Sequence, residues 1–242
     1  MFRNSNMITR DIRFICPECG KEMVRTVTLP ADFQIFRDGD QMICVPCGNA
    51  RQAHIEQQRI EIEKQSRLIA TGVKPEFFVY DFSKANREMF SWIKQNTETN
   101  MLVISEVNTG KTRAMCKALL DENNSGLRCR YMEFGTLSAI YSGEKKESTT
   151  AAQRFINRIV GSYDILILDD IDKVKLTETT GELLYKILNA VYSRSAKIRL
   201  WMTCNHSGQE LMNKFEIRDQ AAAVLSRIER MSDDGRFAVK SF

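Results

Sequence analysis

Short apolar runs alternate with helical patterns of apolar and polar residues from Pro75 onward, and this alternation predicts a three-layer α/β domain. The apolar runs at residues 101–104, 165–168 and 198–202 are predicted to be the buried parts of strands, and the second of these strands is expected to extend over 163–170. Each run is followed by polar residues, which a parallel sheet brings together at the carboxyl ends of its strands, where such sheets bind ligands. We therefore expect a ligand site at that edge of the sheet.

Residues 49–71 are strongly polar, and neither Gly nor Pro interrupts them before Gly72 and Pro75. This pattern predicts one helix of about six turns. Its few large apolar positions are Ile55, Ile60, Ile62, Leu68 and Ile69. A helix with so narrow an apolar face does not belong in a core. We expect it to be either a solvated connector or an arm that binds a partner protein through its apolar positions.

The composition is that of a globular protein, with 43% hydrophobic and 27% charged residues among 242. A net charge of +4 permits contact with nucleic acid but does not require it. No apolar stretch approaches the roughly 20 residues of a membrane span, and residues 1–10 lack the apolar segment of a signal peptide. We therefore expect a cytoplasmic protein without membrane contact.

Four of the seven cysteines form two C-x-x-C pairs, each followed by a glycine that is expected to allow a tight turn. The pairs are Cys16 with Cys19 and Cys44 with Cys47. Four thiolates form a tetrahedral Zn²⁺ site with no open position for water, so we predict a structural zinc ribbon. Between the two pairs we expect strand-like runs at residues 23–29 and 41–44, with a turn at residues 38–40. The duplication argues against a redox dithiol. The remaining cysteines are predicted to be reduced core thiols: Cys116, Cys129 and Cys204.

A nucleotide site is indicated where the first predicted strand runs into S-E-V-N-T-G-K-T, residues 105–112, and a helical pattern over 113–121 follows. This is the order of a P-loop, in which backbone N–H groups at a helix N-terminus hold phosphates. Lys111 is predicted to contact the β- and γ-phosphates of ATP, and Thr112 to ligate Mg²⁺. The predicted cofactor-binding residues of the loop are Asn108, Thr109, Gly110, Lys111 and Thr112.

The second predicted strand ends in two carboxylates, and the third ends at an amide. Asp169 is predicted to hold Mg²⁺ directly or through water, as Mg²⁺–nucleotide chemistry requires. Asp170 is predicted to polarise the attacking water. Asn205 is expected between Asp170 and the γ-phosphate. The only histidines, His54 and His206, are interpreted as structural or surface residues.

With these motifs the chain resembles AAA+ ATPases of the DnaC/DnaI helicase-loader group, bacterial or phage-encoded, from about residue 60 to the end. The resemblance includes an aromatic-rich segment with Phe77 and the sequence L-S-R-I at residues 225–228. It implies an AAA+ P-loop domain with a parallel sheet and without a C-terminal lid. It also implies that Arg227 is an arginine finger that reaches ATP on a neighbouring subunit.

The same resemblance implies an ATP-dependent loader that binds a hexameric replicative helicase of the DnaB type and delivers it onto single-stranded DNA during replication initiation. Several copies would associate on the helicase ring, and the zinc domain would bind the helicase, as in the DnaI-like branch. The expected domains are a zinc ribbon (1–48), a connecting or partner-binding helix (49–72) and the ATPase domain (73–242). Tyr141, Lys145 and Lys146, in residues 137–150, are candidates for DNA contact.

Three residues depart from the pattern of the group: Ser105 and Glu106 at the start of the P-loop, and Asp170, where many AAA+ proteins have Glu. These departures favour ATP as a switch with slow hydrolysis. A transposition-helper ATPase and a zinc-containing nucleic-acid-binding protein with a weak ATPase core remain alternatives. For a ClpX-type unfoldase, the segment after Asn205 is expected to be too short to form the helical lid.

Overall fold

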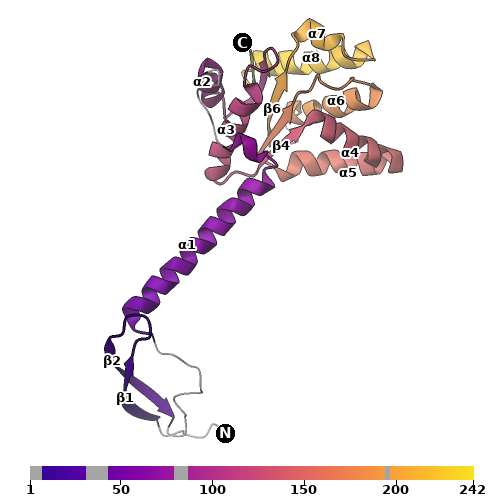
Figure 1. Ribbon diagram of the computed structural model, residues 1–242. Helices are drawn as coiled ribbons and strands as arrows, with labels where there is room; N and C mark the ends of the chain where they lie inside the picture. The colour runs from indigo at the N-terminus through magenta and orange to yellow at the C-terminus, as the bar shows by residue number, and fades with distance from the viewer. Residues whose placement is uncertain (1–6, 31–42, 79–86, 194–196) are drawn as a thin grey trace. The chain divides into compact units, whose positions relative to one another are not determined.

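The computed structural model describes residues 7–30, 43–78, 87–193 and 197–242. The chain divides into two compact units, Met1–Glu63 and Lys64–Phe242 (Figure 1). Within the described ranges, no helix combines the length and the apolar character that crossing a membrane demands.

The first unit contains an antiparallel hairpin of β1 (Met7–Ile15) and β2 (Glu22–Pro30). Cross-strand hydrogen bonds stabilise its register, since Thr26 Oγ1 donates to Asp11 Oδ1 at 2.6 Å. The strand predicted over residues 23–29 is thus confirmed. The predicted turn at 38–40 and residues 41 and 42 of the strand-like run at 41–44 lie outside the described residues. Residues 43 and 44 are described and belong to no strand, because they lead directly into the helix that follows.

Helix α1 (Val45–Ala70) confirms the predicted long polar helix, although it begins four residues earlier than residue 49. None of its residues is buried, and its exposed isoleucines include Ile62 and Ile69, at 65% and 75%. At its C-terminal end Arg130 Nη1 donates to the Ala70 carbonyl at 2.9 Å, and Tyr131 N donates to the Thr71 carbonyl at 2.7 Å. These bonds attach the end of the helix to the second unit.

The second unit is built on a five-stranded parallel sheet with the strand order β4-β5-β6-β3-β7. The strands are β3 (Asn100–Ile104), β4 (Cys129–Glu133), β5 (Ile165–Asp169), β6 (Arg199–Cys204) and β7 (Phe237–Ser241). The three strands predicted from their apolar runs are β3, β5 and β6, and they are neighbours in the sheet. Polar residues that follow these strands therefore meet at one edge.

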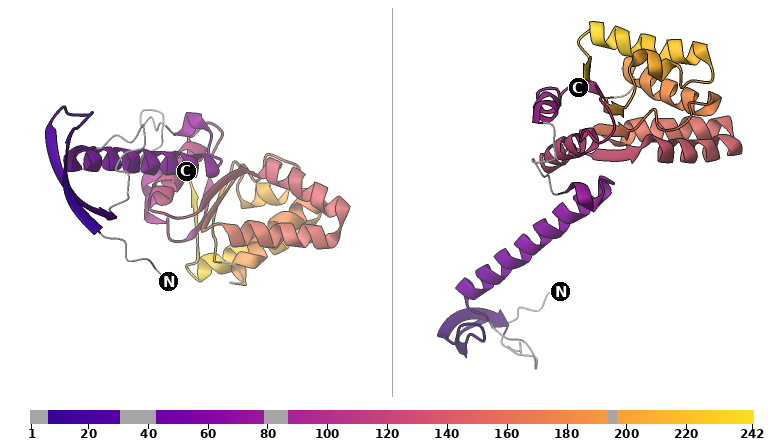
Figure 2. Two further views of the ribbon diagram at one scale, coloured as in Figure 1. Left: turned by 90° about the horizontal axis from the view of Figure 1, so that it is seen from below. Right: turned by 45° about the horizontal axis from the view of Figure 1, so that its top comes forward.

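Helices cover both faces of this sheet (Figures 1 and 2). The short η1 (Pro75–Phe77), α2 (Arg87–Gln95) and α3 (Lys111–Asn124) belong to one side. The other side carries α4 (Phe134–Glu147), α5 (Thr149–Ser162), α6 (Glu178–Tyr192), α7 (Gly208–Met212) and α8 (Arg218–Asp233). This arrangement confirms the predicted three-layer α/β class.

Alternate side chains of the strands form two separate cores. On β5, Leu166 and Leu168 pack in the core under α4, α5, α6 and α8, while Ile165 and Ile167 pack in the core under α2 and α3. All four side chains are fully buried. Because both faces of the strand are covered, its sequence reads as a continuous apolar run rather than an alternating one. The two cores fix the carboxyl ends of the strands, on which the candidate site is built.

Candidate ATP site and cysteine cluster

The P-loop follows β3 and leads directly into α3. Asn108 and Gly110 have left-handed backbone conformations, with φ of 65° and 89°, which Asn tolerates and Gly adopts without strain. The Thr109 hydroxyl donates to the Glu106 carbonyl at 2.9 Å, so it accepts from the buried Ser105 hydroxyl at 2.6 Å. Ser105, which departs from the usual glycine, therefore closes the base of the loop.

Lys111 lies in the first turn of α3 and is only 5% exposed. Its ammonium donates to Asn205 Oδ1 at 2.6 Å and to the Glu106 carbonyl at 3.2 Å. The structure therefore brings together two predicted site residues that lie 94 positions apart in the chain, Lys111 and Asn205.

Asp169, the last residue of β5, accepts hydrogen bonds from three hydroxyl groups. Thr112 Oγ1 lies 2.9 and 3.0 Å from its two carboxylate oxygens, Tyr131 OH lies 2.9 Å from Oδ2, and Thr203 Oγ1 lies 2.6 Å from Oδ1. Burial, with the charge of Asp170, raises the pKa of Asp169 although these bonds oppose the shift. Thr112 and Asp169 thus lie within hydrogen-bond distance of each other, close enough for both to reach one cation. Tyr131 and Thr203 are supports that the sequence did not single out.

Asp170 has a left-handed backbone with φ of 54°, and its N–H donates to Thr203 Oγ1 at 2.8 Å. Asp and Asn tolerate this conformation better than longer side chains do, which gives a physical reason for Asp here instead of Glu. Its carboxylate lies 3.3 Å from Lys173 Nζ and 3.5 Å from Asn205 Nδ2.

A cavity of about 460 Å³ opens over the P-loop. Its wall includes three residues that sequence reasoning did not assign to the site: Phe77, Arg113 and Lys173. The Arg113 guanidinium lies over the Phe77 ring at 5.4 Å and donates to the Glu76 carbonyl at 3.3 Å. The remaining lining residues are Val107, Asn108, Gly110, Lys111, Thr112, Asp170 and Asn205. The predicted phosphate, acid and amide groups therefore face one cavity of the size range of ligand sites.

Arg227 does not line this cavity. Its guanidinium donates to Asn189 Oδ1 at 3.2 Å and to Tyr185 OH at 3.1 Å, and it lies 5.2 Å from the ring centres of both Tyr185 and Tyr192. In the described part of the chain it thus bridges α8 to α6 instead of pairing with Glu229. Its role in trans stays a prediction.

The suggestion that Tyr141 stacks a DNA base is wrong. Residues 137–147 belong to α4, and Tyr141 is fully buried with its hydroxyl accepting from Lys186 at 3.4 Å. Lys145 pairs with Glu182 at 2.5 Å. The helical periodicity of the segment turns the aromatic ring into the core, so it offers no stacking surface.

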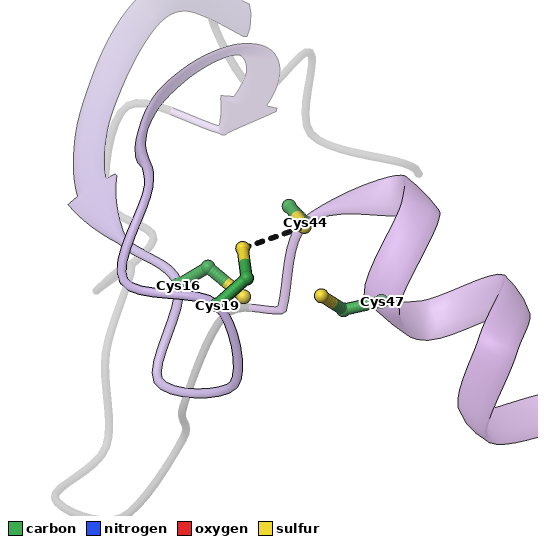
Figure 3. A group of neighbouring side chains, drawn as sticks. All are labelled: Cys16, Cys19, Cys44 and Cys47. Carbon is green, nitrogen blue, oxygen red and sulfur yellow. Dashed lines mark hydrogen bonds between the residues drawn. The ribbon is translucent and has the colours of Figure 1, made fainter.

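The four predicted metal ligands form one cluster, whose sulfur atoms all lie within 4.8 Å of one another (Figure 3). Cys16 and Cys19 lie in the turn after β1, Cys44 immediately precedes α1 and Cys47 lies in its first turn. The Cys19 and Cys44 sulfurs are 3.7 Å apart, close to the roughly 3.8 Å edge of a tetrahedron with Zn–S bonds of about 2.3 Å. The donor set therefore fits a tetrahedral thiolate site.

The two knuckles differ in their backbone. Gly20 has φ of 70° and its N–H donates to the Cys16 carbonyl at 2.8 Å, as a tight turn requires. Gly48 instead lies inside α1, so the second pair is presented by a helix N-terminus and not by a glycine turn. Backbone N–H groups of Cys44, Cys19 and Glu18 lower the pKa of Cys16 to about 6, which favours the thiolate.

The three single cysteines are buried free thiols, as predicted: Cys116, Cys129 and Cys204. Burial raises the pKa of the last two to about 12, so they remain protonated and inert at neutral pH. They therefore serve as matched controls for the cluster.

Among solved structures, the chain is similar to DnaI, with 14% identity over 70% of this chain and 94% of that one and a TM-score of 0.53. It is also similar to AMPPCP-bound DnaA from Aquifex aeolicus, with 20% identity over 62% of this chain and 47% of that one and a TM-score of 0.50. A DnaC helicase loader matches at 13% identity over 64% and 86%, with a TM-score of 0.48. The chain spans about half the length of the initiator structures that it matches, 47% to 50%.

No match was found among curated proteins. A family model described as IstB-like ATP binding protein matches residues 79–235, which is more than half of the chain. This match covers the P-loop, Asp169, Asp170 and Asn205, and the matched residues lie in the unit built on the five-stranded parallel sheet, beside which the chain carries a cysteine cluster. The chain belongs to the family of IstB-like ATP-binding proteins.

Proposed function

We propose that this ATPase is a helicase loader, which binds a hexameric replicative helicase and delivers it onto single-stranded DNA under the control of ATP. The observation that carries the proposal is the convergence of Lys111, Asp170 and Asn205 on one cavity, in a chain that also carries a four-cysteine module. Asp169 lies just behind this cavity and is bonded to the lining residue Thr112. A nucleotide switch and a separate docking module are the two parts that such a loader needs.

In the proposed site, the backbone N–H groups of Asn108, Thr109 and Gly110 hold the phosphates at the N-terminus of α3. Lys111 leaves its carbonyl partner at Glu106 and pairs with the β- and γ-phosphates. Thr112 and Asp169 are the residues that would hold Mg²⁺. The ion, when bound, offsets the charge of the phosphate oxygens.

Asp170 accepts a hydrogen bond from the attacking water and orients it, while Asn205 contacts the γ-phosphate. The short reach of Asp170 and its neighbour Lys173, at 3.3 Å, favour slow hydrolysis. Asn205 contacts Lys111 and lies near Asp170, two groups placed at the γ-phosphate. The hydrogen bonds of Asn205 would therefore change when the γ-phosphate leaves. ATP therefore acts as a switch rather than as fuel for rapid turnover.

The four cysteines would hold a structural Zn²⁺, and the zinc module would bind the helicase. Supporting this assignment is the fit of the four sulfurs to a tetrahedral site. Helix α1, which has no buried residue, joins the module to the ATPase unit. Several copies would line up on the helicase ring, each supplying Arg227 to the ATP of its neighbour.

The test is to mix the chain with the replicative helicase of its own host and to measure the mass of the product by light scattering. A loader forms a large complex, and the complex is lost when Cys16 and Cys19 are replaced by Ser. A transposition helper, the alternative function, shares the ATP site but forms its complex with a transposase. Failure to bind the helicase while binding a transposase encoded nearby would replace the proposal by that alternative.

A further inference from the structure

We propose that Asp172 and His206 form a positioning pair that holds the Asn205 amide in the orientation needed for ATP hydrolysis. This inference rests on the proposed role of the ATP site and adds two residues to it. Neither lines the cavity over the P-loop, so we assign both a positioning role and no contact with the nucleotide.

Asp172 binds Asn205 at two points. Its side chain is fully buried in the loop after β5, Oδ2 accepts the Asn205 backbone N–H at 2.9 Å, and Oδ1 accepts the Asn205 side-chain Nδ2 at 3.1 Å. A carboxylate that binds both the backbone and the side chain of one residue leaves that side chain a single rotamer. Asn205, which directly follows β6, is therefore held by a residue in the loop that follows the neighbouring strand β5.

The two ends of the amide face opposite kinds of partner. Asn205 Oδ1 accepts from Lys111 Nζ at 2.6 Å, and an ammonium group can only donate. Asn205 Nδ2 faces Asp172, and an ionised carboxylate can only accept. Rotation of the amide by half a turn would break both bonds and place like groups together. Asp172 thus sets Asn205 with its amide oxygen toward Lys111 and its amide nitrogen toward the side of Asp170, the residue proposed to orient the attacking water.

His206 holds Asp172 in turn. Its Nδ1 forms a short hydrogen bond with Asp172 Oδ2, the same oxygen that accepts the Asn205 backbone N–H. A buried carboxylate needs such donors, because its desolvation is costly. Although burial raises the pKa of Asp172, the bonds from His206 and Asn205 outweigh that effect and lower it. The carboxylate consequently stays an acceptor at neutral pH.

The surroundings of His206 suggest the substitutions that isolate its hydrogen bond. His206 is 33% exposed at its side chain and lines an apolar groove with Ile104 and Leu211. Leucine would keep apolar contact in that groove while removing the donor. Asparagine would retain a donor at the place of Nδ1. The other histidine, His54, bonds only to Gln58 on α1 among the described residues and provides a matched control.

The experiment compares ATP hydrolysis and nucleotide affinity in the full chain for His206→Leu, His206→Asn, His54→Leu and Asn205→Ala. We expect His206→Leu to lower kcat about tenfold with KM and ATP affinity nearly unchanged, the factor that follows from losing one hydrogen bond to a charged group. His206→Asn should recover most of the rate, and His54→Leu should match the wild type. In the Asn205→Ala background, His206→Leu should have no further effect, because the pair acts through Asn205.

Equal effects of His206→Leu in the presence and absence of Asn205 would overturn the inference, as would a wild-type kcat for His206→Leu. Asp170→Asn is measured alongside as a test of the site itself. If Asp170→Asn loses hydrolysis and His206→Leu does not, the positioning pair fails while the ATP site stands. If Asp170→Asn hydrolyses ATP as fast as the wild type, the site assignment fails, and the positioning pair fails with it.

Discussion

The hydroxyl of Tyr131 on β4 donates a hydrogen bond of 2.9 Å to Oδ2 of Asp169 at the end of β5. Both residues are buried, and burial together with the charge of Asp169 raises the pKa of Tyr131, so the phenol stays protonated and keeps donating. This bond links the edge strand of the sheet to the carboxylate proposed to hold Mg²⁺. It makes Tyr131 part of the support of the ATP site.

Replacing Tyr131 by Phe should remove that bond and leave the buried carboxylate with two hydroxyl partners. We expect a loss of about 1.5–3 kcal/mol in the free energy of unfolding, the usual cost of removing a donor from a charged acceptor. The affinity for ATP in the presence of Mg²⁺ should also fall, by roughly fivefold. Urea unfolding and nucleotide titration measure the two effects. The matched control is Tyr163→Phe, since Tyr163 caps the C-terminal end of α5, away from the P-loop. This substitution should change neither the stability nor the ATP affinity.

Asp170→Asn should stop ATP hydrolysis while leaving ATP affinity within about twofold of the wild type, because the amide cannot accept a proton from water. Asn also tolerates the left-handed backbone at this position, so the fold should be preserved. Single-turnover hydrolysis and a binding titration with the same preparation test both statements. Wild-type turnover by Asp170→Asn would contradict the assignment of the attacking-water residue.

Metal analysis of the purified chain should find one Zn²⁺ per molecule, bound by the four-cysteine cluster. The double replacement of Cys16 and Cys19 by Ser should abolish it and unfold the first unit, since metal ligation contributes directly to folding free energy. ATP binding by the second unit should persist, because no ligand of the cluster belongs to Lys64–Phe242. Cys129→Ala, which changes a buried thiol elsewhere, should retain the metal. A zinc-free wild type would refute this prediction.

Arg227→Ala should keep ATP binding but lose the hydrolysis that appears when several copies assemble on a helicase ring. The substitution also removes the contacts with Tyr185 and Asn189, so its thermal stability must be measured beside its activity. A mixture with Lys111→Ala separates the two effects. That variant retains Arg227, so a mixed ring contains interfaces with one intact finger and one intact P-loop, and some activity should return. A co-assembled mixture without any rescue would argue against action in trans.

Much of the fold follows from the sequence because β3, β5 and β6 are buried on both faces and read as plain apolar runs. The positions of Lys111, Asp169, Asp170 and Asn205 follow as well, since parallel strands end at a common edge. Each of these residues comes directly after, or one loop beyond, a strand that the apolar pattern identifies.

The residues that support the site could not be predicted from the sequence, because no local sequence feature marks them. Tyr131 lies on an edge strand whose sequence is only partly apolar, and its hydroxyl meets Asp169 only through the strand pairing. Asp172 and His206 are far apart in the chain, and their contact depends on two loops that meet at the sheet edge. Tyr141 was wrongly predicted to contact DNA, because a tyrosine near lysines is typical of nucleic-acid-binding surfaces. The sequence alone did not show that its side chain lies on the buried face of α4.

The most direct measurement of the central claim is helicase loading onto a closed single-stranded DNA circle. Such a circle has no free end, so a hexameric ring can encircle it only after the ring has been opened. We predict that the host's replicative helicase unwinds a strand annealed to the circle when the wild-type chain and ATP are present. It should fail with Lys111→Ala, and succeed with Lys117→Ala, whose lysine pairs with Asp121 on the surface of α3. Unwinding that is unaffected by the chain, or that is equally stimulated by Lys111→Ala, would contradict an ATP-dependent loader.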